Sequence, residues 1–588
     1  AQMAECATAD EPEPQQGGGG SNCTLSSGYK PDQSNGFQNT PCLVFKVNYH
    51  FLRPSDGSGP YVGDMSTMVN TEMNSLNGYY DELLVPALPV VPPAEHIVDS
   101  RVRFVLTGIY YHDDDARHDH YFNLNSHPNC GSALRDEFGV DQDRVINIFF
   151  YRYANAGTRY GCGPSSIMTV NMINLMPTFD TGTLAHELGH IIGLNHTFSC
   201  WSTGTTCSDD GISDTYAPDC NHRAEGCGPD VAWLNTFSAC PLLTGVGISN
   251  NIMGYNSCRR YLSPLQLAKI HHRNITTVAK RMYVLCEPHS FNPPITVSNS
   301  AIWETSKVIN ADIEVEAGAI LDVRCTLYMS PHAKTIVKPH GKLIVDGGTL
   351  TAHSGGCTTF WAGIEVWGNS NQHQFPIDHP THQGLVVLKN GATIEHAREA
   401  IRLWKPHDWG SMGGVVQVKG THGQPGALFL NCRRSVEFMK YQNFQPGSIP
   451  TVLRPNHSSF MYADFRVDDD YRGGHDFEAH VTMWAVDGVV FRACNFENAQ
   501  TTGPDSWQLG EGIFSIDANY SVGANCTVLL PYGTPCPPEN LDRGSFVGLG
   551  HGIDARNSGS GRGFAAGSLD FANNVVGIIT FGIFVAVA

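Results

Sequence analysis

The chain has 588 residues, which is enough for several domains that each bury a core of their own. Its formal net charge of −19 at pH 7 argues against nucleic acid and against an anionic membrane surface as the main partner. No apolar run reaches the roughly 20 residues of a membrane-spanning helix, and the tail VVGIITFGIFVAVA is broken by glycine and predicts buried strand.

Residues 1–40 have the composition of a flexible segment, rich in Pro, Gly and Ser with QQGGGGSN in the middle. The opening AQMAECATADEPEP has neither the basic region nor the apolar core of a signal peptide, as expected for a chain whose signal is already removed. The chain has 18 cysteines, and a cluster of them lies between 200 and 258. Disulfides of a secreted protein are favoured over structural zinc, because the CxxC pairs of zinc ribbons are absent.

Strands and helices alternate from Cys42 onward. The strands are predicted at 42–52, 101–111, 144–153 and 166–175, and the helices at 64–84 and 181–194. The second helix has Thr181 or Thr183 near its start and Gly193 at its end. This order predicts an α/β domain over 41–288, followed by a Pro-rich linker over 289–300.

Residues 301–588 carry short strands at recurring intervals and few helix-length amphipathic runs. Examples are ADIEVEAGAILDV, GKLIVDGGTLTA, GLVVLKNGATIEHA, VDGVVFRACNFENA and LDFANNVVGI. Such quasi-repeats predict an all-β solenoid of the right-handed parallel β-helix type, with a pair of β-sandwiches as the alternative. The repeats still continue where the chain stops, so we expect a truncated module.

The run HELGHIIGLNH, from His186 to His196, has the spacing of a catalytic metal site. On a helix, His186 and His190 project from one face and can bind one Zn²⁺. Glu187 lies beside the metal and can hold a water molecule, and a turn at Gly193 brings His196 in as the third ligand. A structural zinc site is the alternative, but it would close the fourth position with protein.

Three segments together resemble the pappalysin (cytophagalysin-like) family of metzincin zinc metallopeptidases over about 42–286. They are HELGHIIGLNHTF, DDGISDTYAPD and NIMGYNSCRRYLSPLQL. The resemblance implies an α/β metzincin fold, one catalytic zinc ion and hydrolysis of peptide bonds in proteins or peptides. It also implies that Met253 forms the methionine turn beneath the zinc ligands. Tyr255, two residues later, can donate its hydroxyl to the developing oxyanion.

The segment DDGISDTYAPD resembles a calcium-binding segment of the pappalysin family. It has Asp210-Gly211 where the family has Gly-Asp, and DTYAP where the family has DTP. Asp210 and Asp214 are the predicted carboxylate ligands of Ca²⁺, and an ordinary polar loop is the alternative. We also predict that disulfides stabilise this region, with Cys207 paired to Cys240 and Cys227 paired to Cys258.

Cys6 precedes the Gly-rich stretch, in a segment that resembles the Cys-Gly-Thr run of pappalysin-like chains, with Ala7 in place of Gly. A thiolate there could take the open zinc position and keep the enzyme latent. The alternative is a disulfide from Cys6 to Cys23 or to Cys42.

Two alternative hypotheses, from other functional classes than peptidases, stay open at this point. The first is an adhesin or glycan-binding solenoid with a vestigial protease domain. Its candidate sugar-stacking residues are Trp361, Trp367, Trp404 and Trp409, although the intact zinc motif argues against a dead protease. The second is a β-helix lyase or glycosidase, for which Val467–Asp470 is the candidate cluster; a solvated loop is the simpler reading.

Overall fold

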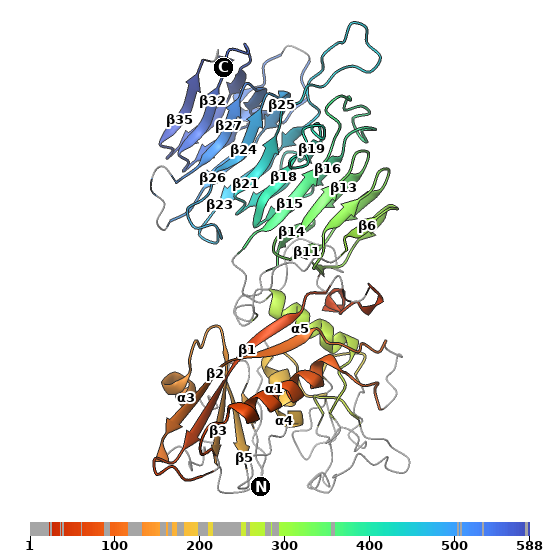
Figure 1. Ribbon diagram of the computed structural model, residues 1–588. Coiled ribbons are helices and arrows are strands. Elements are labelled where there is room, and N and C mark those ends of the chain that lie inside the picture. The colour runs from red at the N-terminus through yellow and green to blue at the C-terminus, as the bar shows by residue number, and fades with distance from the viewer. Residues whose placement is uncertain are drawn as a thin grey trace. The chain divides into compact units, whose positions relative to one another are not determined.

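The computed structural model describes residues 23, 26–35, 37, 40–59, 61–87, 95–115, 132–152, 160–162, 167–172, 181–197, 210–215, 249–254, 259–276, 284, 293–353, 359–501, 505, 508–531, 534–582 and 586–587. Contacts divide the chain into two compact units. The N-terminal unit contains the described residues from 26 to 284, and the solenoid unit contains Cys23 and the described residues from 293 onward (Figure 1).

The N-terminal unit is built on one sheet with the strand order β2-β1-β3-β5-β4. The strands are β1 (Leu43–Arg53), β2 (Val102–Asp113), β3 (Ile146–Arg152), β4 (Tyr160–Cys162) and β5 (Ile167–Met172). All neighbours in this sheet are parallel except β4 and β5. β1 is buried along almost its whole length, as expected for a central parallel strand that is covered on both faces.

Helices complete the unit. They are α1 (Ser66–Asp81), α3 (Ser132–Phe138), α4 (Thr181–Ile191) and α5 (Pro264–Thr276), with short 3-10 turns η1 (Ser26–Tyr29) and η2 (Gln33–Asn35). α1 packs against β2 and α4, and η1 packs against α5, where Tyr29 lies 4.7 Å from His272 between ring centroids. The α/β prediction is confirmed. Helix α3 was not predicted from the sequence.

The solenoid unit consists of three parallel sheets that share a core. The first sheet contains β7 (Ala301–Trp303), β10 (Ile320–Val323), β13 (Lys342–Asp346), β16 (Leu385–Lys389), β19 (Val415–Lys419), β22 (Ser459–Met461), β25 (Asp487–Arg492), β28 (Asn519–Gly523), β33 (Phe564–Gly567) and β36 (Ala586–Val587). The second contains β8 (Lys307–Ile309), β11 (Thr326–Met329), β14 (Thr349–Ala352), β17 (Ala392–Glu395), β20 (Ala427–Leu430), β23 (Ala463–Val467), β26 (Asn495–Asn498), β31 (Gly544–Val547) and β34 (Leu569–Ala572).

The third sheet contains β6 (Ile295–Val297), β9 (Ile313–Val315), β12 (Lys334–Val337), β15 (Trp361–Val366), β18 (Ala397–Arg402), β21 (Arg434–Phe438), β24 (Ala479–Trp484), β27 (Glu511–Ile516), β32 (His551–Arg556) and β35 (Val576–Phe581). A short antiparallel pair, β29 (Asn525–Cys526) and β30 (Leu541–Asp542), and the turn η5 (Pro538–Asn540) lie in one connection. Each coil of the chain adds one strand to each sheet. The predicted parallel solenoid is therefore confirmed, and the β-sandwich alternative is wrong because a sandwich pairs antiparallel strands.

Stacked phenylalanines run through the solenoid core. In the second sheet, the buried rings of Phe429, Phe465, Phe496 and Phe546, and the partly exposed ring of Phe571 at the end of the stack, lie at successive centroid distances of 4.8, 4.7, 4.5 and 5.0 Å. Their near-parallel rings repeat once per coil, so each ring stabilises the register of the next strand. This inner repeat is the physical basis of the quasi-repeats in the sequence.

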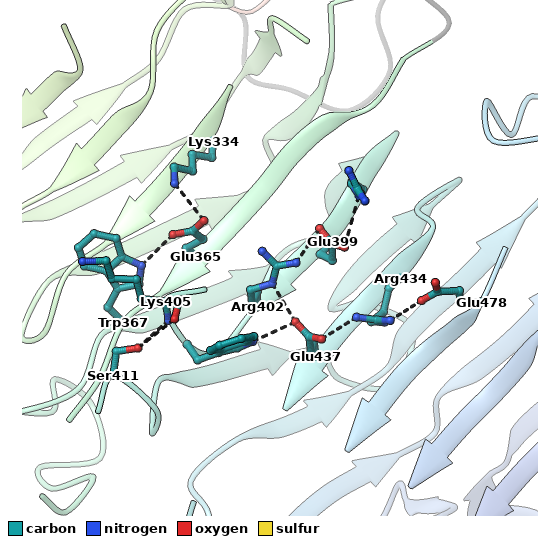
Figure 2. A network of polar contacts seen from close by, with 12 residues as sticks. Lys334, Glu365, Trp367, Glu399, Arg402, Lys405, Ser411, Arg434, Glu437 and Glu478 are labelled. Carbon is teal, nitrogen blue, oxygen red and sulfur yellow. Dashed lines mark hydrogen bonds and ion pairs between the residues drawn. The ribbon is translucent and has the colours of Figure 1, made fainter. Parts of the chain in front are cut away.

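The outward face of the third sheet carries a row of alternating charges (Figure 2). Glu365, Arg402 and Glu437 are register partners on β15, β18 and β21. Arg402 Nε donates to Glu437 at 2.8 Å, and Arg434 Nη1 donates to the same carboxylate at 2.6 Å. Glu365 in turn accepts from Lys334 at 3.1 Å.

The cysteines correct one expectation. Cys23 forms a disulfide with Cys325, so it is not the partner of Cys6. A second disulfide joins Cys526 to Cys536. Cys432 and Cys494 are buried thiols, and burial raises the pKa of each to about 12.

The structure also shows where candidate residues of the two alternative hypotheses, the glycan-binding solenoid and the β-helix lyase or glycosidase, lie. Trp361 is fully buried in the solenoid core, so the sugar-stacking role considered for it is wrong. The acidic cluster ending at Asp470 is a turn: Asp468 accepts from Asn431 at 2.8 Å, and Asp469 accepts from the backbone N–H of Thr501 at 2.7 Å. Among the helices described, none is long and apolar enough to cross a bilayer.

Candidate metal centre

Helix α4 positions the first two histidines and the glutamate. Gly182 to Ile191 of this helix are all buried, because the helix lies between other elements of the unit. His186 and His190 stand one turn apart, and their rings are close, with centroids 4.8 Å apart. The hydroxyl of Tyr80 on α1 donates to the carbonyl of Ala185 at 2.7 Å and ties α1 to the backbone beside His186.

The end of α4 redirects the chain toward the same point. Gly193 has a φ of +117°, a conformation that side chains with a Cβ rarely adopt. The N–H of Leu194 donates to the carbonyl of Gly189 at 2.9 Å, which is the bond of a Schellman turn. A Cβ at Gly193 would also lie 2.5 Å from Cδ of Arg273. The turn thus needs glycine and returns the chain so that His196 faces the helix.

Three imidazole nitrogens converge at this point. The Nε2 atom of His190 lies 3.2 Å from Nε2 of His186 and 3.1 Å from Nε2 of His196, and the latter two atoms are 3.1 Å apart. Nitrogens at about 2.0–2.1 Å around a tetrahedral ion would be roughly 3.3 Å apart. The three histidines therefore fit the ligand set of one zinc ion.

Two of the rings are held in the tautomer that a metal ligand requires. His186 Nδ1 donates to the carbonyl of Ile252 at 2.7 Å, and His190 Nδ1 donates to the carbonyl of Leu194 at 2.8 Å. Each bond directs the lone pair of the ring to Nε2. Backbone carbonyls of two different segments thus orient the two ligands.

The electrostatics keep the rings neutral near pH 7. Burial is the main cause that lowers the pKa of all three histidines, to about 4 for His190. The positive charge of Arg259 lowers each pKa further. Neutral imidazole is the form that binds zinc.

Met253 lies directly beneath the helix that carries the ligands. It is fully buried, and a Cβ at Gly189 would lie 2.5 Å from its sulfur. The Met253 carbonyl accepts from the N–H of Thr197 at 3.4 Å, next to His196. Asn251 begins this turn and accepts from the N–H of Met253 at 2.9 Å.

Two residues of the site were missed in the sequence analysis. Gly189 allows Met253 to approach α4, and its signal was a small residue between the histidines of the motif. Arg259 donates from Nη1 to Thr183 Oγ1 at 3.0 Å and from Nε to the carbonyl of Gly254 at 3.1 Å. Nothing local in the sequence marks it, because its partner is on a distant helix.

Asp210 and Asp214 have protein partners within the described structure. Asp214 accepts from Ser263 Oγ at 2.6 Å and from the N–H of Leu265 at 2.9 Å, so it caps the start of α5. Asp210 accepts from Thr215 Oγ1 at 2.8 Å. Among the described residues, neither belongs to a group of three metal-ligating side chains.

Several predicted residues lie outside the part of the chain that the structure describes. They are Cys6, Cys207, Cys227, Cys240, Tyr255 and Cys258.

The comparisons with known proteins agree with this geometry. Residues 166–273 match the Peptidase M43 family, which is described as pregnancy-associated plasma protein-A. An extracellular metalloprotease of Aspergillus oryzae is 28% identical over 181 residues, which cover 28% of this chain and 51% of that protein. Human pappalysin-1 is 28% identical over 185 residues, which cover 27% of this chain and 10% of that protein.

The chain therefore spans about half, or a tenth, of the length of these curated relatives. Among solved structures, mature mirolysin of Tannerella forsythia in complex with a cleaved peptide is 16% identical. The match has a TM-score of 0.29 and covers 42% of this chain and 97% of that one.

Proposed function

Because this chain carries a metallopeptidase domain of the pappalysin family, we propose that it is a secreted zinc-dependent endopeptidase. One observation carries the proposal: the Nε2 atoms of His186, His190 and His196 lie 3.1–3.2 Å from one another. The substrates are proteins or peptides. An extracellular location is supported by the extracellular relative and by the disulfides.

The proposed roles combine the geometry of the three histidines with the resemblance to the pappalysin family. His186, His190 and His196 would hold the ion through Nε2, and a bound zinc would supply an acidified water and a Lewis acid for the scissile carbonyl. Glu187, next to the first ligand on α4, would take the proton of that water and deliver it to the leaving amine. Tyr255 would donate its hydroxyl to the oxyanion, and Met253 would support the ligands from below.

Casein hydrolysis in the presence of a chelator tests the proposal. The full chain should hydrolyse casein, lose the activity with a chelator and regain it when zinc is added. Full activity in the chelated and metal-free protein would overturn the assignment. The same assay separates the peptidase from an adhesin with a vestigial protease domain, because the adhesin would show no hydrolysis at all.

The calcium site is a separate part of the proposal. Asp210 and Asp214 would contribute carboxylate oxygens to Ca²⁺, and the predicted disulfides Cys207–Cys240 and Cys227–Cys258 would stabilise the same region. Calorimetry with and without calcium tests the first part. An unchanged melting temperature would mean that Asp214 acts as a helix cap only.

Three further points complete the proposal. The proposed domains are a flexible N-terminal segment over 1–40, the metallopeptidase domain over 41–288, a linker over 289–300 and the solenoid over 301–588. The solenoid would be a contact module for a glycan or another surface.

Cys6 would hold the zinc site latent through its thiolate. The Cys6→Ala variant should then be active at once, whereas the parent should show a lag; equal initial rates would exclude the switch.

A further inference from the structure

We propose that the outward face of the third sheet binds a polysaccharide of neutral sugar units, through an aromatic platform of Trp404, Trp409 and Trp484 and the pocket beside it. This inference specifies the contact proposed above for the solenoid, and it does not depend on peptidase activity.

The aromatic platform consists of three indoles that contact one another on the surface. Trp404 and Trp409 stack with centroids 5.7 Å apart, and Trp409 and Trp484 meet edge to face at 6.0 Å. Trp409 is 57% exposed and Trp484 is 37% exposed. Indole faces of this size are seldom left in water without a partner, since they carry much apolar area.

The platform is preorganised. The indole N–H of Trp404 donates to Glu437 at 3.0 Å, which sets the plane of that ring. Trp409 stands at the tip of a tight loop in which the N–H of Lys405 donates to Ser411 Oγ at 2.8 Å. The N–H of Ser370 also donates to the Gly410 carbonyl at 2.9 Å. A ligand that stacks on these rings therefore binds without a large entropic cost of ordering the loop.

A pocket of about 780 Å³ continues this face along the sheet. Thr482, on the same strand as Trp484 and two residues before it, lines the pocket together with Arg434, Glu478, Phe514 and His551. Residues two apart on a strand point to the same side, so the platform and the pocket share one surface. The pocket thus combines an aromatic wall with donors and acceptors that can bind hydroxyl groups.

The charges on this face favour a neutral ligand. Arg434 pairs with Glu437 and Glu478, and Arg556 pairs with Asp554 at 2.7 Å. His551 lies 3.5 Å from Glu511. Lys405 lies over the ring of Trp367 at 4.7 Å, whereas the other cations named here are matched by carboxylates, so the face has little surplus positive charge that would attract a polyanion.

The geometry also favours a sugar chain over an extended peptide. Peptides that bind to sheets usually pair with a free strand edge through main-chain hydrogen bonds. Here β15, β18, β21, β24 and β27 each pair on both sides. The face instead carries flat indole rings, which can stack on the apolar faces of pyranoses. Its polar side chains can form hydrogen bonds with vicinal hydroxyl groups.

Affinity gel electrophoresis of the full chain tests the proposal, with hydroxyethylcellulose, galactomannan, xyloglucan or polygalacturonate cast in the gel. We expect at least one of the three neutral polymers to retard the parent. Trp409→Ala and Trp484→Ala should each weaken the retardation at least ten-fold. Phe571→Ala removes an aromatic ring that is 38% exposed on the second sheet and should leave the retardation unchanged.

Melting curves establish that each variant is folded, and casein hydrolysis by Trp409→Ala should equal that of the parent. Loss of casein hydrolysis without any glycan binding would overturn the proposal in favour of a protein-docking face. No retardation by any neutral polymer, equal retardation of Trp409→Ala, or retardation by polygalacturonate alone would also overturn it. Because none of the binding results requires peptidase activity, failure of the proposed enzyme function is detected separately.

Discussion

Gly189 and Met253 approach each other so closely that a Cβ on the glycine would lie 2.5 Å from the methionine sulfur. The contact joins the helix of the first two histidines to the turn that lies below it. Since Met253 is fully buried, its side chain has little room to move away.

Gly189→Ala should therefore destabilise the N-terminal unit by about 1–3 kcal/mol, the usual range for overpacking a core. Denaturant unfolding measures the change. The matched control is Gly78→Ala, because a Cβ at this half-buried position of α1 meets nothing within 4 Å. Combining Gly189→Ala with Met253→Ala should cost less than the sum of the two single changes, because the smaller side chain relieves the clash. Additive effects would show that the contact is not the cause.

Glu187→Ala should retain zinc and the fold but lose most of the turnover, by about 10²–10⁴-fold, because it removes the proton-transfer group alone. Metal analysis and single-substrate kinetics measure both quantities. His190→Ala is the comparison, since it should lose the metal as well. A Glu187→Ala enzyme that works at the parent rate contradicts the role of the base.

Arg259 should favour substrates with acidic side chains next to the scissile bond. Its guanidinium contacts Thr183, one turn before Glu187 on α4, and its charge acts on all three histidines. Peptides that differ only by Glu or Lys beside the cleaved bond measure this preference. Arg259→Gln should lower the Glu-to-Lys ratio of kcat/KM by roughly five-fold, or about 1 kcal/mol, whereas Arg259→Lys should retain most of it. An unchanged ratio in Arg259→Gln would place the guanidinium away from the substrate.

Glu72 should make the N-terminal unit less stable at alkaline pH. Burial raises the pKa of this carboxyl from 4.5 to about 7, while a bond from Thr181 Oγ1 at 3.0 Å acts in the opposite direction. The folded state thus binds the proton more tightly. The stability that the protonated Glu72 carboxyl contributes is complete below about pH 4.5 and is lost as the pH rises to about 7.

Glu72→Gln should consequently be more stable than the parent at pH 8 by roughly 3 kcal/mol and equal to it near pH 4.5. Thermal melting at the two pH values measures the difference. Glu82→Gln, at a side chain that is 77% exposed, serves as the control for the loss of one carboxylate. A constant difference between parent and Glu72→Gln at both values would mean that the carboxyl ionises normally.

The local features of this protein could be read from its sequence, because they depend on short-range periodicity. The helix with His186 and His190 follows from a spacing of one turn, and the stop at Gly193 follows from the left-handed conformation that glycine tolerates. The parallel solenoid was also predictable, since each coil repeats the same alternation of inward and outward residues.

Contacts between distant segments were decided by the tertiary structure alone. Gly189 meets Met253, Arg259 reaches Thr183, and Cys23 bonds to Cys325, although no local pattern pairs these residues. The same holds for the tryptophans: Trp361 faces the core while Trp409 faces water. Periodicity assigns a residue to a strand or a helix, whereas its partner depends on how the coils and helices pack, which short-range preferences do not encode.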